Sequence, residues 1–307
     1  METLLQWGID LIIAIQKIRG PALDHLFRLI SFMGNQEFYL LLLPVLLWCV
    51  DFGLGARIAI LFLLSGYINT DLKDLFHMPR PFDLNPSVKL IDARGYGLPS
   101  GHSQSAFVVW GGIAALMRKN WLWVLAIGLI FSISFSRVYL GAHFPTDVLA
   151  GWMIGMVLLT LYVSCDKKVE SRLTELSLCT QISLALAISL GLLLLHPTKQ
   201  TTAALAALAG IGAGLALTHR YVSFSTWGPW WQRVCRFLVG GAIILALYFG
   251  FQIIFPGEGS PLYLVFRFMR YFFIGMWGSF GGPWLFRWLR LAPADDKHAC
   301  SRQGSED

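Results

Sequence analysis

Charged side chains are scarce in this chain: Asp, Glu, Lys and Arg together make up 14% of its 307 residues, whereas a soluble domain carries roughly 25%. That scarcity argues against an ordinary soluble enzyme. Hydrophobic residues account for 56%, and apolar runs long enough to cross a bilayer recur almost to the end of the sequence. Because lipid satisfies no backbone polar group, each run is expected to form a helix.

Other signals are also missing. The net charge is +6, yet no basic tract is interleaved with aromatic residues, so we expect no nucleic-acid partner. There is no carboxylate cluster suited to magnesium and no pairing of His and Cys suited to zinc, so we expect no metal and no cofactor. The first residues lack a basic start and a small-residue cleavage site, which favours an interfacial segment over a cleaved leader.

The apolar runs predict an all-α, polytopic membrane helical bundle of about nine transmembrane helices, preceded by a short N-terminal interfacial helix. The expected spans are residues 30–50, 54–76, 100–117, 121–140, 145–165, 176–196, 201–218, 235–255 and 261–285. The first of these is interrupted by Asn35, Gln36 and Glu37. We expect four regions: an interfacial segment at 1–24, a core at 25–165, additional helices at 166–291 and a disordered cytoplasmic tail at 292–307.

The distribution of Lys and Arg indicates the orientation in the membrane. With nine alternating helices, most basic loops fall on one side, which is therefore expected to be cytoplasmic. The N-terminus, the 77–98 loop and the turns at 140–145, 197–200 and 256–260 then face outward. All five cysteines fall near cytoplasmic helix ends or in the tail, so free thiols are expected. They are Cys49, Cys165, Cys179, Cys235 and Cys300.

The first chemical motif contains two cations around the end of the second span. Lys73 closes the helix and Arg80 opens the outer loop, between Pro79 and Pro81. The two prolines stiffen the chain on either side of the guanidinium. Two cations so close together can bind one anion, although a Lys and an Arg snorkelling at a helix end would have the same spacing.

The second motif is Pro99-Ser100-Gly101-His102, directly before an apolar run. Pro99 and Ser100 are typical of a helix start, and the free N–H groups of a helix N-terminus suit phosphate oxygens. Gly101 permits close approach of a ligand to the backbone. His102 can serve as an acid beside the bound group, although a capping Ser with a bystander His is the plainer interpretation.

The third motif contains Arg137, His143 and Asp147. Arg137 ends the fourth span, His143 lies in the outer turn, and Asp147 begins the fifth helix. A carboxylate behind an imidazole fixes its tautomer, which is the arrangement of an activated His nucleophile. A capping Asp and an interfacial His would also fit this motif taken alone.

All three motifs fall at one membrane face in this topology. Together they supply three cations, two imidazoles, one carboxylate and a helix N-terminus, which are the groups that phosphoryl transfer requires. Without a metal site, a metal-free covalent mechanism follows.

In order and spacing, the three motifs resemble the signature of the type-2 phosphatidic acid phosphatase superfamily. The resemblance covers residues 73–147 and implies a phosphatase core at 25–165. It implies that Lys73, Arg80 and Arg137 bind phosphate with help from Ser100 and Gly101. It further implies that His143 is the nucleophile and forms a phosphohistidine, that His102 protonates the leaving group and that Asp147 orients His143.

The expected enzyme is a metal-independent membrane phosphatase acting on a lipid phosphomonoester or pyrophosphate. Phosphatidic acid, phosphatidylglycerophosphate, polyprenyl and sphingoid phosphates all fit such a site. A soluble sugar phosphate, as in the glucose-6-phosphatases of the superfamily, remains an alternative. A lipid transporter or a non-catalytic lipid-binding protein is a rival, weakened by the absence of an evident inverted repeat. We expect a bacterial inner membrane with the site facing the periplasm, or else an endoplasmic reticulum with a lumenal site.

The last span contains Arg267 and Arg270 near its outer end, beside Tyr263 and Tyr271. Three residues apart, the two arginines can share one helix face and contact a second phosphate or a substrate headgroup. Interfacial anchoring by arginine and aromatic residues is the simpler hypothesis. The additional helices are expected to shape the substrate entrance or a homodimer contact.

Overall fold

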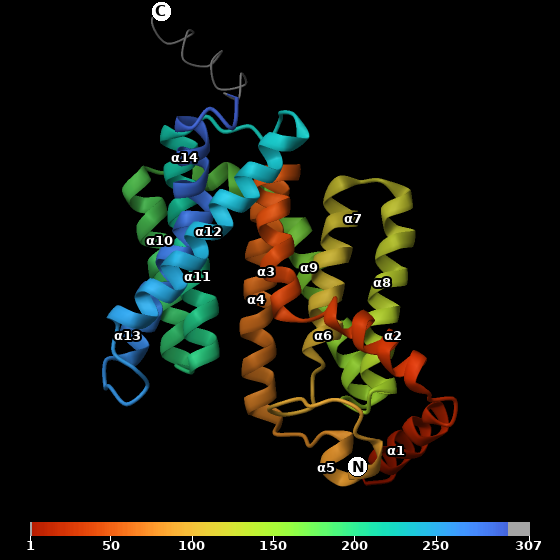
Figure 1. Cartoon of the computed structure of the whole chain (residues 1–307). Coiled ribbons are helices and arrows are strands. Elements are labelled where there is room, and N and C mark those ends of the chain that lie inside the picture. The colour runs from red at the N-terminus through yellow and green to blue at the C-terminus, as the bar shows by residue number, and fades with distance from the viewer. Residues whose placement is uncertain (1, 294–307) are drawn as a thin grey trace, which may run out of the picture. The chain divides into compact units, whose positions relative to one another are not determined.

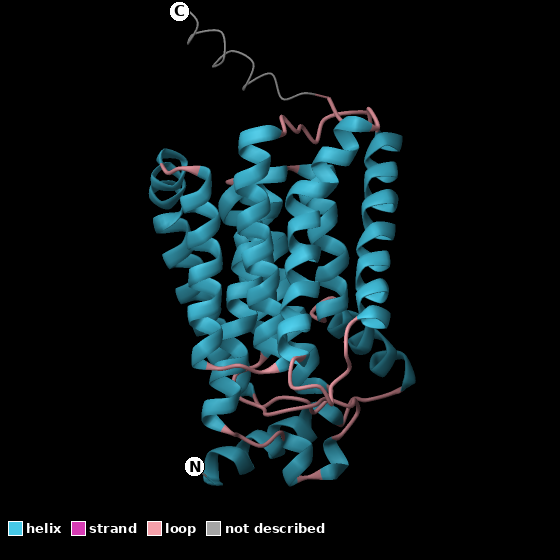
Figure 2. Ribbon diagram, turned by 90° about the vertical axis from the view of Figure 1, so that its left-hand side faces the viewer, coloured by secondary structure: helices cyan, strands magenta, loops and turns pink. Residues whose placement is uncertain are grey.

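The computed structural model describes residues 2–293, and every regular element in that range is helical (Figures 1 and 2). The all-α prediction is therefore confirmed. The elements are α1 (Glu2–Gln16), α2 (Pro21–Phe32), α3 (Gln36–Val45), η1 (Leu46–Val50), α4 (Phe52–Phe76), α5 (Pro81–Leu84), η2 (Pro86–Val88), α6 (Gly101–Ala106), η3 (Phe107–Gly111), α7 (Gly112–Met117), α8 (Asn120–Tyr139), α9 (Pro145–Glu175), α10 (Leu178–Leu195), α11 (Lys199–Tyr221), α12 (Trp230–Ile254), α13 (Tyr263–Met276), η4 (Trp277–Gly281) and α14 (Gly282–Trp288).

Each of the nine predicted spans corresponds to a helix or to a run of consecutive helices. Within the described residues, six helices are long and apolar enough to cross a membrane, or seven if the bent pair α2 and α3–η1 counts as one span. Two other predicted spans are interrupted by the π-helical turns η3 and η4. The count of nine therefore stays a prediction.

Two of the predicted boundaries differ from the structure. The first span is not one straight helix: it breaks at residues 33–35 and bends by 52°, where Gly34 and Asn35 favour a turn. The fifth helix continues to Glu175, well beyond the predicted end at 165. We expected a tail from residue 292 onward. Its residues from 294 onward, including Cys300, lie outside the described residues. The four described cysteines are free thiols.

The chain forms two compact units, and the first comprises, among the described residues, 2–40 and 65–166. Helices α1, α2, α6 and α7 pack against helix α8 in this unit. Helix α9 approaches the α6 segment through Gly151, where an added Cβ would lie 2.7 Å from the Ser100 carbonyl oxygen. Gly155 also leaves no space for a side chain, because an added Cβ would lie 2.9 Å from the Phe107 Cβ. Small residues thus allow the close packing that membrane helices use.

Helix α1 packs against η2 and against the connection between α8 and α9. Its residues Ile9 and Ile12 form an apolar cluster with Val88 and Phe144. The Gln16 side chain donates from Nε2 to two backbone carbonyl oxygens, at 2.9 Å and 2.8 Å. The first region of the chain therefore packs on the core, while its interfacial position stays a prediction.

The second unit comprises residues 41–64 and, among the described residues, 167–293. Helices α11 and α13 pack backbone to backbone, because a Cβ at Gly275 would lie 2.4 Å from the Ala207 carbonyl oxygen. Arg236 of α12 is fully buried and donates to several carbonyl oxygens of the segment before α12, including that of Thr226 at 2.9 Å. This unit is a helical bundle with its own buried core.

Candidate active site

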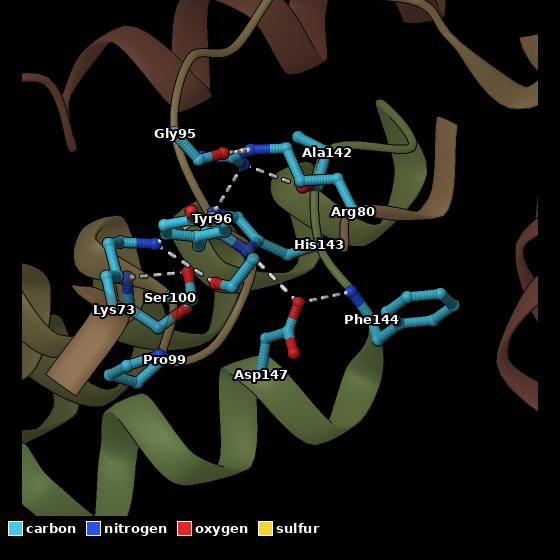
Figure 3. Close-up of polar contacts among 12 residues, drawn as sticks. Lys73, Arg80, Gly95, Tyr96, Pro99, Ser100, Ala142, His143, Phe144 and Asp147 are labelled. Carbon is cyan, nitrogen blue, oxygen red and sulfur yellow. Dashed lines mark hydrogen bonds and ion pairs between the residues drawn. The ribbon is translucent and has the colours of Figure 1, made fainter. Parts of the chain in front are cut away.

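The first unit contains the eight site residues predicted from the three motifs. Lys73 lies in the last turn of α4, and Arg80 precedes α5. Ser100 is the N-cap of α6, which begins Gly101-His102. Arg137 lies in the last turn of α8, His143 in the following turn, and Asp147 in the first turn of α9. Figure 3 shows most of these side chains converging.

Arg80 connects the first motif to the third. It is only 5% exposed. Its Nη1 donates to the Ala142 carbonyl oxygen at 2.9 Å and lies 3.1 Å from Nε2 of His143 (Figure 3). A guanidinium has donors and no acceptor, so Nε2 of His143 must accept and is unprotonated. The free lone pair of the imidazole is thus directed toward the cation.

The other imidazole nitrogen of His143 contacts the carboxylate of Asp147. The Nδ1–Oδ2 distance is 3.2 Å, and both side chains are nearly fully buried. The same Oδ2 accepts the backbone N–H of Phe144 at 2.9 Å, which fixes the carboxylate at the start of α9. With Nε2 unprotonated, Nδ1 carries the proton and donates it to Asp147.

The surroundings keep His143 uncharged. Burial lowers the pKa of its imidazole well below the usual 6.5, and the nearby positive charges of Lys73, Arg80 and Arg137, with a smaller effect from His102, lower it further. Both effects disfavour the imidazolium. A neutral imidazole with a free Nε2 lone pair is the form that can attack an electrophile.

Four consecutive backbone carbonyls, at residues 94–97, hold the first two cations in place. Arg80 donates from Nε to the oxygen of Gly95 and from Nη2 to that of Arg94, each at 2.8 Å. Lys73 donates from Nζ to the oxygens of Tyr96 at 2.5 Å and Gly97 at 3.1 Å (Figure 3). This segment lies outside the three motifs, and its sequence signal is the pair of glycines at 95 and 97.

The helix start predicted at Ser100 is confirmed. Its Oγ accepts from the N–H of Ser103 at 3.4 Å, and its own N–H donates to the Asp147 carbonyl oxygen at 3.0 Å. The second and third motifs are therefore joined through the backbone. A Cβ at Gly101 would lie 3.0 Å from Oδ1 of Asn69, so the glycine also accommodates this neighbouring amide.

His102 and Arg137 have partners that the motif analysis missed. Nε2 of His102 lies 2.7 Å from Oδ1 of Asn35. Arg137 donates from Nη1 to the hydroxyl of Ser31 at 2.6 Å, whereas its buried Nε has no hydrogen-bond partner among the described residues. Ser31 lies just before the bend between α2 and α3, and Asn35 lies at the end of this bend. A polar residue within an apolar run was the available signal, since Asn35 interrupts the first predicted span.

Arg267 and Arg270 belong to the second unit, not to the unit that holds the motifs. Arg267 donates from Nε to the Lys199 carbonyl oxygen at 2.8 Å and from Nη1 to the hydroxyl of Tyr263 at 3.0 Å. Arg270 lies over the ring of Tyr248, 5.7 Å from its centroid. Between residues 2 and 293, no group of three or more His, Cys, Asp or Glu side chains is arranged to hold a metal ion.

The chain matches a family model described as "PAP2 superfamily" over residues 54–171, and another described as "PAP2 superfamily phosphatase, transmembrane extension" over residues 202–294. It is 29% identical over 211 residues to lipid phosphate phosphatase delta of Arabidopsis thaliana, which covers 63% of this chain and 50% of that protein. It is 31% identical over 169 residues to a probable sphingosine-1-phosphate phosphatase of Dictyostelium discoideum, covering 50% of this chain and 42% of that protein.

A bacterial relative is covered more fully. The chain is 30% identical over 166 residues to phosphatidylglycerophosphatase B of Bacillus subtilis, which covers 50% of this chain and 80% of that protein. By contrast, the chain spans half the length or less of the Arabidopsis and Dictyostelium proteins.

Proposed function

The chain belongs to the PAP2 superfamily and is an integral membrane protein, and from these premises we propose that it hydrolyses a phosphomonoester or pyrophosphate of a lipid through a phosphohistidine at His143. One observation carries the proposal. Nε2 of His143 presents a lone pair beside the Arg80 guanidinium, while Nδ1 is held by the Asp147 carboxylate. That is an oriented, uncharged nucleophile close to three cations.

In the first step, the positive charges of Lys73, Arg80 and Arg137 hold the phosphoryl oxygens, helped by the backbone at Ser100 and Gly101. The Nε2 lone pair of His143 attacks phosphorus while the bond from phosphorus to the lipid oxygen breaks. That oxygen takes a proton from protonated His102. The products are the free lipid alcohol, or the shorter lipid phosphate when the substrate is a pyrophosphate, and a phosphohistidine. Asp147 stabilises its Nδ1 proton.

In the second step, a water molecule attacks the phosphohistidine. Neutral His102 takes a proton from the water as its oxygen bonds to phosphorus. The phosphorus–Nε2 bond breaks, and its electron pair returns to Nε2. Inorganic phosphate leaves, His102 is again protonated and His143 is again neutral. No step requires a metal ion, and we propose that the enzyme is metal-independent.

The chemistry of the surroundings supports a lipid substrate. The motifs lie at the ends of apolar helices, where an amphiphile can place its phosphate among the cations and its chains in the bilayer. The relatives bear the names of lipid phosphate, sphingosine-1-phosphate and phosphatidylglycerophosphate phosphatases, and these substrates share that amphiphilic form. A soluble sugar phosphate offers the same phosphoryl group without the chains.

We also propose the finer organisation predicted from the sequence. Residues 25–165 form the catalytic core, and residues 166–291 shape the substrate entrance or a homodimer contact. The site faces the periplasm from a bacterial inner membrane. A cysteine-accessibility assay at the 77–98 loop tests the orientation, because labelling from the cytoplasmic side alone is incompatible with it. An endoplasmic-reticulum lumen is the alternative compartment.

The experiment compares the wild type, H143A and the control H25A, in which an exposed histidine of α2 is replaced. Phosphate release is measured in detergent from phosphatidic acid, phosphatidylglycerophosphate, a sphingoid phosphate, a polyprenyl pyrophosphate and glucose 6-phosphate. We expect H143A to lose at least about 10⁴-fold in kcat, as nucleophile removal does elsewhere, while H25A keeps wild-type rates. Wild-type activity should survive EDTA and be blocked by vanadate.

The intermediate gives a second readout. Brief reaction with ³²P-labelled substrate should leave acid-labile, base-stable label on the wild type and none on H143A. Turnover that persists in H143A would contradict the nucleophile assignment. Folded wild type that releases phosphate from nothing in the panel would instead favour transport or lipid binding.

A further inference from the structure

The bend between α2 and α3 brings polar side chains to the site from a segment outside the three motifs. The helical run breaks at residues 33–35. Gly34 lies so close to the motifs that an added Cβ would be 2.7 Å from Cγ2 of Ile133 and 2.8 Å from Cδ2 of His102. The backbone at the bend therefore lies directly against the ring of His102.

Asn35 follows at the end of this bend. It precedes the first residue of α3, a position where asparagine commonly accepts a hydrogen bond from the N–H groups of its own helix. Here its Oδ1 lies 2.7 Å from Nε2 of His102, 67 positions along the chain. A carboxamide oxygen can only accept, so Nε2 of His102 carries a proton in this contact.

This contact determines which nitrogen of His102 does the chemistry. With the Nε2 proton engaged by Asn35, exchange of a proton with the substrate must pass through Nδ1. The contact also keeps the ring orientation fixed while Nδ1 loses and regains its proton in the two steps.

Four positions earlier, on the other side of the bend, Ser31 is 1% exposed. Its hydroxyl accepts from Nη1 of Arg137 at 2.6 Å. The bend therefore supports two different parts of the site. Ser31 orients Arg137, the cation that would bind the transferred phosphoryl group. Asn35 contacts His102, the residue that would protonate the departing oxygen.

We infer that Asn35 is a positioning residue for the leaving-group acid His102, which it holds in the Nε2-protonated form with Nδ1 free for proton transfer. The inference rests on the proposed function, since it assigns a partner to the acid of that mechanism. Asn35 would therefore support departure of the leaving group, whereas Ser31 would support binding of the phosphoryl group.

A change of leaving group tests this separation. Departure of an alkyl oxygen from short-chain phosphatidic acid needs protonation, whereas nitrophenolate departs from p-nitrophenyl phosphate without it. We expect N35A to lower the ratio of kcat/KM for phosphatidic acid to kcat/KM for p-nitrophenyl phosphate by about 10- to 100-fold, the loss that follows removal of the hydrogen-bond partner of a metal-bound histidine. Because kcat/KM covers only the steps up to leaving-group departure, hydrolysis of the phosphohistidine, in which His102 serves both substrates as the base, does not enter this ratio. N35D, which keeps an acceptor oxygen, should restore most of this ratio. S31A should lower both rates together and leave the ratio unchanged.

The control is Q36A, which replaces the neighbouring exposed amide and should leave both rates at the wild-type level. An unchanged ratio in purified, folded N35A would overturn the inference, as would N35D behaving like N35A. If N35A does not fold, N35D and N35S measured against Q36A decide the question by the same ratio.

H102A separates failure of this inference from failure of the proposed function. If H102A lowers the ratio and N35A does not, the acid assignment holds and only the role of Asn35 is wrong. If H102A lowers both kcat/KM values equally, the acid role in the proposed mechanism is itself wrong.

Discussion

The guanidinium of Arg80 lies against the imidazole of His143, with Nη1 3.1 Å from Nε2. Because arginine only donates, this contact fixes the tautomer of the histidine and places the Nδ1 proton on the side of Asp147. In the proposed mechanism, the same N–H group must turn from Nε2 to a phosphoryl oxygen when substrate binds. The nucleophile is thus oriented by the cation that also binds its target.

The acid side of the pH profile should extend below the ordinary range of histidine. Burial and neighbouring cations lower the pKa of His143 well below 6.5. The neutral form, which is the reactive one, remains the major form of His143 as the pH falls through 6.5, because this imidazole gains a proton only when the pH reaches its lowered pKa. The measurement is kcat/KM against pH, which reports the free enzyme, corrected for ionisation of the substrate phosphate. Loss of activity on the acid side that follows an enzyme pKa of 6.5 or above would contradict this expectation.

Asp147→Asn should change the tautomer of His143 while leaving the fold intact. The asparagine amide can donate to Nδ1 and so favour the tautomer protonated at Nε2, which has no lone pair to attack with. We expect kcat to fall by about 10²- to 10⁴-fold with a small change in KM, as for asparagine in the corresponding position of a catalytic triad. Asp92→Asn, at an exposed carboxylate, is the control and should be neutral. A D147N enzyme with near-normal kcat would show that the carboxylate is not needed.

Arg80→Lys should be far from conservative. The guanidinium contacts three carbonyl oxygens and one imidazole nitrogen at once, and a lysine ammonium cannot reproduce that planar fork. We expect kcat/KM to fall more than about 10²-fold, with a lower melting temperature as the 94–97 segment loses two hydrogen bonds. Arg94→Lys, at an exposed side chain on the same segment, should retain activity. Equal behaviour of the two variants would contradict the assigned role.

Gly151→Val should disturb the site from a distance. The added side chain would meet the Ser100 carbonyl oxygen, 2.7 Å from the Cβ position, and so push α9 away from the start of α6. Overpacking of this kind costs about 1–3 kcal/mol, and it would also separate Asp147 from the second motif. Thermal unfolding in detergent and kcat should both fall. Gly128→Val, on an exposed face of α8 with no atom within 4 Å of its Cβ position, should change neither.

Arg267 and Arg270 can be tested together against the two roles considered for them. Arg267 already donates to a carbonyl oxygen and a tyrosine hydroxyl, which favours a structural anchor at the start of α13. For the double variant R267A/R270A we therefore expect a lower melting temperature with unchanged KM and kcat toward each lipid in the panel. A rise in KM confined to one headgroup would instead support a substrate contact.

Much of the fold could be predicted because the relevant signals are local. The apolar runs specified helices, Ser100 marked a helix start that the structure confirms, and Asp147 lies in the first turn of the fifth helix as expected. The bend at residues 33–35 was missed as a break, because an apolar run with a short polar interruption is compatible with a straight helix. The extension of α9 to Glu175 was missed because polar residues beyond 165 end the hydrophobic signal without ending the helix.

The order of the residues alone establishes which groups are present and which of them pair at short range. His143 and Asp147 are four positions apart, so the start of one helix suffices to bring them into contact. The partners that lie far along the chain follow from the packing of the helices and not from local sequence. His102 meets Asn35 across 67 positions, Arg137 meets Ser31 across 106, and Arg80 meets His143 across 63. Such contacts depend on how bent helices and a carbonyl-rich segment pack in space, and no local periodicity encodes that.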